Sequence, residues 1–342
     1  MEEFDVVVIG AGPTGATAAK VLAENGLKVL LVDRMKLPRY KSCSGMLIKK
    51  AIDLVVGYYG ESIPDTVKCA PFENRGMVLT NEEGKEYIFK QNALNVWRSE
   101  FDYWLTKKAV NSGAELRCET SALCCTTNDD YAELVLHSDK DYTVQTKYIV
   151  DCEGATASFK RSLDGKKPKM ITTYQTFNEG YINLDPHYFY AYLQPKLSEY
   201  DAWFNIKDGM LVLGVAVKNT KNIPLYYNRF IRFLGQKHGL QIKKEIKKEK
   251  WIMPHIQKDF QIEYGIGRVL FAGEVAGFLN PMGEGIYAGI ESGYSVAKVI
   301  IGCFSNPHQI LNAYMNQVEP LKNYMERQWN LLEKITVFFD NI

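Results

Sequence analysis

Three glycines near the start of the sequence have the spacing of a phosphate-binding loop, Gly-x-Gly-x-x-Gly, at Gly10, Gly12 and Gly15. The first glycine allows a tight turn, the second lets a pyrophosphate approach the backbone, and the third lets a helix pack closely on a strand. Pro13 and Thr14 lie inside the same loop. The spacing therefore predicts that this loop binds the phosphates of a dinucleotide.

The residues around this loop have the pattern of a strand–helix–strand unit, which would position it. Residues 6–9 and 28–32 are apolar runs typical of buried strands, and residues 16–23 between them are helix formers. The N-terminus of such a helix presents free N–H groups and a partial positive charge to the phosphates. Asp33 and Arg34 follow the second strand, and Asp33 is placed to accept hydrogen bonds from a ribose. This unit fits FAD and NAD equally well.

A second glycine-rich loop, "GEVAGFLNPMGEG", occupies residues 273–285. It follows a buried-strand pattern at residues 269–272 and precedes a helix pattern that begins at Ile286. The N-terminus of a helix at this place can stabilise negative charge on a reduced isoalloxazine ring, which is one way in which a protein tunes a flavin. The second loop therefore favours a flavin over a nicotinamide.

Four stretches together resemble one family. Residues 267–300 are similar to the second FAD fingerprint of the p-hydroxybenzoate-hydroxylase-type flavoproteins, and their "NPMGEGI" segment most resembles the geranylgeranyl reductase family of FAD-dependent oxidoreductases. The other stretches similar to that family are "PRYKSCSGMLIKKAIDL" (38–54), "VWRSEFDYWLTKKAVNSGAEL" (96–116) and "VDCEGATASFKR" (150–161). The resemblance implies an α/β fold, in which a Rossmann-like FAD-binding domain is interleaved with a mainly antiparallel β-sheet substrate domain and followed by a C-terminal helical tail.

The resemblance also implies FAD as the cofactor and assigns its contacts to the matching stretches. The expected FAD-binding residues are Gly10, Gly12, Pro13, Thr14, Gly15, Asp33, Arg34, Cys43, Ser44, Gly45, Arg98, Glu153, Gly154, Gly273, Glu274, Pro281, Gly283, Gly285 and Ile286. Glu153 and Glu274 depart from the family, because they stand where aspartates are usual and are one methylene longer. Their contacts with the ribityl chain are therefore expected to be shifted or bridged by water.

Cys43, in "RYKSCSG" at residues 39–45, has two interpretations. The family motif that it matches lies beside the flavin, so Cys43 is a candidate catalytic residue that would donate a proton to the substrate. The alternative is a residue that only shapes the pocket, because a free cysteine is usually a small hydrophobe unless its surroundings lower its pKa. Arg98 is likewise either an ordinary surface arginine or, as its motif implies, a neighbour of the flavin.

The expected domain boundaries follow changes in sequence pattern. Residues 1–165 and 258–305 are expected to bind FAD, with a small β excursion near residues 66–95, and residues 306–342 to form C-terminal helices that pack on the body. Residues 166–257 are rich in aromatics with two-residue alternation, which predicts an antiparallel sheet.

Within this predicted sheet, two strand-like runs meet at Asp208-Gly209, a pair that suits a type I′ hairpin turn. Tyr190 and Trp203 are the candidate substrate contacts, on an aromatic wall of a ligand cavity. The alternative for these aromatics is that they belong to the core.

The amino-acid composition limits the classes of partner and the cellular location that are expected for this protein. Lys plus Arg number 41 against 40 Asp plus Glu, so no net field draws in nucleic acid. No apolar run reaches the ~20 residues of a membrane-spanning helix, although peripheral membrane contact stays open. The seven cysteines contain no C-x-x-C pair and no leader precedes the first strand, which together predict a cytoplasmic location. The five histidines are isolated, so no metal site is expected.

The implied activity is that of a reductase, which transfers hydride from reduced FAD to carbon–carbon double bonds of an apolar, isoprenoid or lipid-like substrate. No second Gly-x-Gly-x-x-Gly stands in the sequence, so NAD(P)H would bind transiently or another redox protein would supply the electrons. Two alternatives stay open: a flavin monooxygenase on an aromatic substrate, and a flavin-containing binding or carrier protein without turnover.

Overall fold

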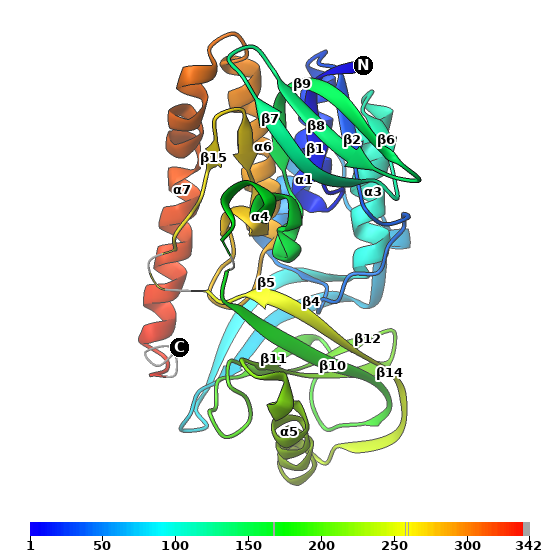
Figure 1. Ribbon diagram of the computed structural model, residues 1–342. Coiled ribbons are helices and arrows are strands. Elements are labelled where there is room, and N and C mark those ends of the chain that lie inside the picture. The colour runs from blue at the N-terminus through cyan, green and yellow to red at the C-terminus, as the bar shows by residue number, and fades with distance from the viewer. Residues whose placement is uncertain (167, 257, 259, 338–342) are drawn as a thin grey trace.

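The computed structural model describes residues 1–166, 168–256, 258 and 260–337, which form two eight-stranded sheets with helices packed around them (Figure 1). The two glycine-rich loops each follow a strand of the first sheet, and the second sheet lies below the first in Figure 1. The long helix α7 (Pro307–Glu333), drawn in red, runs along one side of the molecule from the first sheet toward the second.

The first sheet is mainly parallel. Its strand order is β15 (Gly265–Ile266), β16 (Val269–Phe271), β9 (Asp141–Asp151), β1 (Glu2–Ile9), β2 (Val29–Val32) and β6 (Glu115–Arg117). The strands from β16 to β6 pair in parallel. Val6, Val7 and Val8 are completely buried, as expected for a strand covered on both faces. Because parallel strands share one carboxyl edge, the loops after β1, β2, β9 and β16 meet there.

Helices and a meander cover the two faces of this sheet. Helix α1 (Pro13–Glu24) packs between α3 (Arg98–Asn111) and α6 (Ile286–Gly302), and α7 packs on α6. The other side carries β7 (Ser121–Thr127), β8 (Ala132–His137) and the short α4 (Ser158–Asp164); β8 pairs with the first half of β9, and β7 pairs with β8 (Figure 1). The largest apolar cluster fills the space between this sheet, α1, α6 and α7.

The second sheet is mainly antiparallel. Its strand order is β14 (Gln241–Pro254), β10 (Met170–Tyr181), β13 (Met210–Val217), β12 (Ala202–Lys207), β11 (Tyr188–Tyr192), β4 (Lys68–Thr80), β5 (Glu86–Val96) and β3 (Met46–Leu47). Only the β11–β4 pair is parallel among the described strands of this sheet. Helix α5 (Ile223–His238) buries Phe230 and Leu234 against its outer face, and α2 (Lys49–Tyr59) follows β3.

Several local expectations can be compared with this structure. The hairpin at Asp208-Gly209 is confirmed, because β12 and β13 join through these two residues, with φ angles of 49° and 77°. Strands β4 and β5 lie where a β excursion near residues 66–95 was expected, and they extend the second sheet through the long-range parallel pair with β11, a contact that local sequence patterns do not encode.

Over residues 306–337, the described part of the C-terminal segment, the chain forms one helix rather than several, and this helix continues through Pro320. Leu321, Met325 and Leu332 are buried, in agreement with the expectation that this segment packs on the body. Beyond the helix, Asn81 at the β4–β5 turn donates a hydrogen bond to the Ile335 carbonyl oxygen, 3.1 Å away. Residues 338–342 of the expected tail lie outside the described part. No described helix is both long and apolar enough to cross a membrane.

Candidate cofactor and substrate site

A cavity of about 510 Å³ lies between the two sheets. Loops at the carboxyl edge of the first sheet line one part of it, including Gly10, Gly12, Asp33, Glu153 and Glu274. The inner face of the second sheet lines the other part, with side chains from three of its strands: Thr173, Gln175, Trp203, Trp251 and Met253. One continuous space therefore joins the glycine loops to the aromatic sheet.

The glycine loop leaves the first turn of α1 open. Gly12 is the N-cap residue and no side chain caps the helix, so backbone N–H groups stay available for an anion. Gly10 has φ of 97°, and a Cβ there would lie 2.6 Å from the Cys152 carbonyl oxygen. A Cβ on Gly15 would collide with the Gly10 carbonyl oxygen. The three glycines thus serve the turn and the close helix–strand packing that their spacing predicted.

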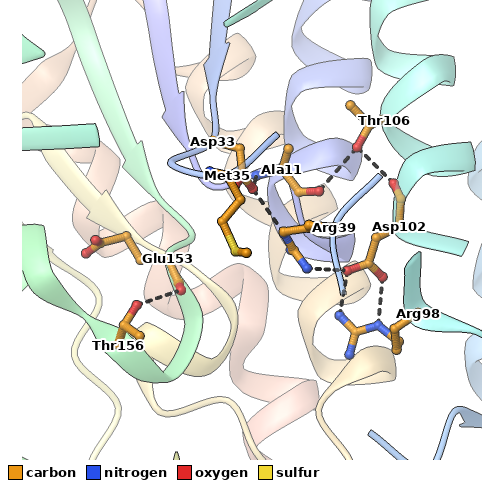
Figure 2. A network of polar contacts seen from close by, with 9 residues as sticks. All are labelled: Ala11, Asp33, Met35, Arg39, Arg98, Asp102, Thr106, Glu153 and Thr156. Atoms are coloured by element: carbon orange, nitrogen blue, oxygen red, sulfur yellow. Dashed lines mark hydrogen bonds and ion pairs between the residues drawn. The ribbon is translucent and has the colours of Figure 1, made fainter. Parts of the chain in front are cut away.

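Asp33 is held by the loops around it (Figure 2). Its Oδ2 accepts hydrogen bonds from the Ala11 N–H at 2.9 Å and from Arg39 Nε at 3.3 Å, and its Oδ1 accepts one from the Met35 N–H at 2.9 Å. The carboxylate therefore ties the glycine loop to the segment after β2, at the place where a ribose is expected. Arg34 also lines the cavity and is exposed to solvent.

Arg98 and Asp102 form a buried pair on the first turns of α3. Arg98 Nε donates to Asp102 Oδ1 at 2.7 Å and its Nη2 to Oδ2 at 2.8 Å, while Arg39 Nη1 lies 3.3 Å from the same carboxylate (Figure 2). Burial works against the charged guanidinium, but the Asp102 carboxylate outweighs it and holds the pKa of Arg98 above its usual value. Arg39 thus bridges two carboxylates, Asp33 and Asp102.

The loop at residues 39–45 contains the Cys43 thiol and lies close to lysine side chains. Cys43 is half-buried in the cavity wall, and its Sγ accepts a hydrogen bond from the Gly45 N–H at 3.4 Å. Lys41 Nζ lies 4.5 Å from the centre of the Trp251 ring, and burial lowers the pKa of this lysine. Lys207 is buried with its ammonium group 4.1 Å from the centre of the Trp97 ring, beside Gly45. The loop is therefore held against the second sheet.

The two glutamates that replace aspartates lie at the cavity but differ in their contacts. Glu153 Oε2 accepts a hydrogen bond from the Phe159 N–H at 2.7 Å, so this carboxyl turns toward the start of α4. Burial raises the pKa of Glu153, although backbone N–H groups and Arg34 oppose the rise. Glu274 Oε2 lies 3.3 Å from the position that a Cβ of Gly154 would occupy, so it faces the other loop.

The loop before α6 forms part of the cavity wall. Pro281 accepts a hydrogen bond from the Tyr200 hydroxyl at 3.0 Å, which ties this loop to the second sheet. Glu284 Oε1 accepts one from the Tyr287 N–H at 2.8 Å, while Glu284 Oε2 is buried without a hydrogen-bond partner among the described residues. Burial raises the pKa of Glu284 to about 7.

Most of the residues expected from the sequence line this cavity, and a few do not. Gly15, Gly45, Gly273 and Pro281 stand just behind the lining, where they shape the loops. Trp203 lines the cavity. Tyr190 lies instead in the apolar cluster between the second sheet and α5, and its hydroxyl accepts a hydrogen bond from the Asp185 N–H at 3.1 Å.

Sequence reasoning missed several polar groups of the site, namely Arg39, Tyr40, Asp102, Thr173, Gln175, Asp201, Trp251 and Glu284. The four-residue spacing between Arg98 and Asp102 on a helix was a usable signal. The strand residues gave only a two-residue alternation, which does not tell which face meets the other sheet. Within the described ranges, no cluster of three His, Cys, Asp or Glu side chains is placed to hold a metal ion.

These residues fit an FAD molecule. The uncapped N-terminus of α1 suits its pyrophosphate, Asp33 suits a ribose hydroxyl, and the cavity leads from there to the aromatic sheet where a ring system has room. The N-terminus of α6 borders the same space through Gly285 and Ile286, where its partial positive charge favours a reduced ring.

Comparison with known proteins agrees with this geometry. The FAD binding domain family matches residues 3–328. A digeranylgeranylglycerophospholipid reductase of Methanocaldococcus jannaschii is 26% identical over 95% of this chain and 82% of its own. A geranylgeranyl diphosphate reductase of Rhodobacter capsulatus is 25% identical over 83% of this chain and 72% of its own.

The fold agrees with a solved structure as well. A geranylgeranyl bacteriochlorophyll reductase-like protein of Thermoplasma acidophilum superposes with a TM-score of 0.81 and 21% identity, over 96% of this chain and 85% of that one. The chain therefore belongs to the FAD binding domain family, and it is an FAD-dependent oxidoreductase of the geranylgeranyl reductase type.

Proposed function

We propose that this protein is a reductase that transfers hydride from reduced FAD to carbon–carbon double bonds of an apolar, isoprenoid or lipid-like substrate. The observation that carries the proposal is the single cavity that joins the phosphate-binding edge of the first sheet to an apolar wall on the second. Phe189, Trp203, Trp251, Leu279 and Met282 make up much of that wall. The names of the two reductase relatives support the same class of substrate.

The protein's own residues would bind, orient and supply charge. FAD, when bound, carries the hydride chemistry. The open turn of α1 would hold the pyrophosphate and Asp33 a ribose, while Arg98, fixed by Asp102, would keep a positive charge beside the ring. Cys43 would donate a proton to the substrate, since its thiol lines the cavity.

This function would assign a different role to each part of the chain. Residues 1–165 and 258–305 would bind FAD, residues 166–257 would contact the substrate, and residues 306–342 would cover the body. The cavity loops support the first part, and the lining strands β10, β12 and β14 the second. NAD(P)H or a redox protein would supply electrons. Each of the seven cysteines is a free thiol at a described position, which supports a cytoplasmic location, with peripheral membrane contact to reach a lipid.

The decisive test is anaerobic. The bound flavin is reduced chemically, a geranylgeranyl lipid is added, and the return of the oxidised-flavin absorbance is followed, with an air-exposed sample in parallel. Reoxidation by the lipid together with a saturated product is the expected result. Reaction with air alone would favour a monooxygenase on an aromatic substrate, and a flavin that reacts with neither would favour a carrier protein.

The role of Cys43 has its own prediction. Cys43→Ala should slow flavin reoxidation by the lipid by about 10²- to 10⁴-fold, the usual contribution of a positioned acid, while leaving lipid binding unchanged. Cys124→Ala is the matched control, because Cys124 is exposed on β7. Stopped-flow absorbance measures both rates. Equal rates for the two variants would make Cys43 a residue that only shapes the pocket.

A further inference from the structure

Asp201 places a carboxyl group in the wall of the cavity on the substrate side. It stands directly before β12, two residues from Trp203, and both side chains line the cavity. Its backbone is fixed, because the Asp201 carbonyl oxygen accepts a hydrogen bond from the Ala216 N–H at 2.9 Å. The neighbouring Tyr200 is bonded through its hydroxyl to Pro281. Asp201 therefore sits where the second sheet meets the loop before α6.

The Asp201 carboxyl differs from the other carboxylates of the site. Asp33 and Asp102 each accept several hydrogen bonds, whereas none of the described residues donates a hydrogen bond to the Asp201 carboxyl or forms an ion pair with it. Trp203, two residues further along the chain, lines the same wall and offers it no positive charge.

Burial alone raises the pKa of Asp201 to about 7, without a contribution from any charged neighbour. The nearby titratable groups include Tyr200, whose pKa is raised by burial and by Asp201, and His255, whose ring lies 6.3 Å from the ring of Tyr200. A carboxyl in this setting is largely protonated below neutral pH, and in that form it both donates and accepts a hydrogen bond. The site therefore disfavours a permanent negative charge and offers a neutral donor.

An apolar ligand that filled the cavity would leave this carboxyl desolvated and unpaired. An unpaired buried polar group is costly, so a site that contains one discriminates strongly against ligands that do not bond to it. Thr173 and Gln175 line the same cavity and add polar character on the second sheet. The wall is thus apolar along most of its length and polar at particular points.

We propose that Asp201 binds a hydroxyl or carbonyl oxygen of the substrate, so that the cavity selects an isoprenoid carrying such an oxygen over the corresponding hydrocarbon. The inference rests on the proposed function for the apolar part of the substrate. It makes Asp201 a residue that determines substrate specificity. It also names the chemical class of the substrate, an oxygenated isoprenoid whose oxygen atom lies near the junction of β12 and the 279–286 loop.

The test uses the FAD-bound protein in its oxidised form, so that the measurement is binding and no turnover occurs. Trp203 and Trp251 line the cavity, and the quenching of indole fluorescence gives the Kd. Farnesol and farnesene are the matched pair, since they share a C15 isoprenoid skeleton; farnesene lacks the hydroxyl group and has one more double bond in its place. Farnesylacetone, a ketone that only accepts hydrogen bonds, is measured at pH 6 and at pH 8.5.

The native protein should bind farnesol about 10- to 100-fold more tightly than farnesene, as expected for one hydrogen bond to a buried group. Its Kd for farnesylacetone should rise from pH 6 to pH 8.5, because the ionised carboxyl no longer donates. Asp201→Leu should remove the preference for farnesol. Asp201→Asn should retain most of it and lose the pH dependence, since an amide donates at both pH values.

The outcomes separate this inference from the proposed function. If farnesol and farnesene bind equally to the native protein, or if Asp201→Leu keeps the preference for farnesol, the role of Asp201 is wrong and the reductase proposal stands. If neither compound binds to the native protein, the isoprenoid substrate is wrong and the inference falls with it. Asp201→Asn changes few atoms, so its FAD absorbance and melting temperature check that the fold is intact.

Discussion

Buried charges around the cavity are stabilised by specific partners, and Asp102 is the clearest case. It is 1% exposed and neutralises Arg98, with Arg39 as a second cation. Asp102→Asn should destabilise the protein by about 3–5 kcal/mol, because it leaves a buried guanidinium without its carboxylate. Asp53→Asn, in the exposed pair with Lys49 on α2, should cost less than about 1 kcal/mol. Urea unfolding measures both, and equal losses would contradict a special role for the buried pair.

Glu284 gives a residue-scale prediction about pH. Burial raises its pKa from 4.5 to about 7, so between these values the folded protein keeps a proton that the unfolded chain releases. Its contribution to stability is therefore fully present below about pH 4.5 and is lost as the pH rises through 7. Glu284→Gln should remove this loss of stability. The free energy of unfolding of the variant, relative to that of the native protein, should therefore rise by roughly 2–3 kcal/mol from pH 4.5 to pH 8. Urea unfolding at a series of pH values measures both proteins. The same pH dependence of stability for the two would contradict this prediction.

At the scale of elements, the contact between α1 and α6 depends on two glycines. A Cβ on Gly293 would collide with the Thr14 carbonyl oxygen, and one on Gly289 would lie 2.6 Å from Thr14 Oγ1. Gly293→Ala should therefore push the helices apart and destabilise the protein by about 1–3 kcal/mol. Gly302→Ala, at the open end of the same helix, should stabilise it by about 0.5–1 kcal/mol. Urea midpoints that shift in the same direction for both variants would contradict this packing.

The elements also show what the sequence alone could predict. Local patterns were sufficient for the glycine loop, the Asp208-Gly209 turn and the apolar stripe of α7, because each depends on neighbours in the chain. The pairing of β4 with β11 and the position of Asp201 were not predictable, since both depend on contacts between distant segments. The expected FAD ligands outside the first glycine loop and Asp33 came from the resemblance, whereas the position of Arg39 between the Asp33 and Asp102 carboxylates emerged only from the three-dimensional contacts.

At the scale of the whole molecule, the cavity lies at a junction between the two sheets. Contacts that cross this junction include the Lys41–Trp251 pair, the Tyr200–Pro281 hydrogen bond and the end of α7, and the largest apolar cluster joins buried residues of both sheets. A cofactor in the cavity would touch loops of the first sheet and reach the second, so it would couple their unfolding. The two parts should then unfold together when FAD is bound.

Removal of FAD tests this coupling. In the FAD-bound protein, the loss of secondary structure by circular dichroism and the release of FAD by fluorescence should share one urea midpoint. Removal should lower the circular dichroism midpoint, because a ligand that binds only the folded state at a thousand times its Kd stabilises it by about 4 kcal/mol. Adding FAD back is the control and should restore the midpoint. A circular dichroism midpoint that does not change on removal would mean that the second sheet is stable without the cofactor, and that the cavity does not join the two parts energetically.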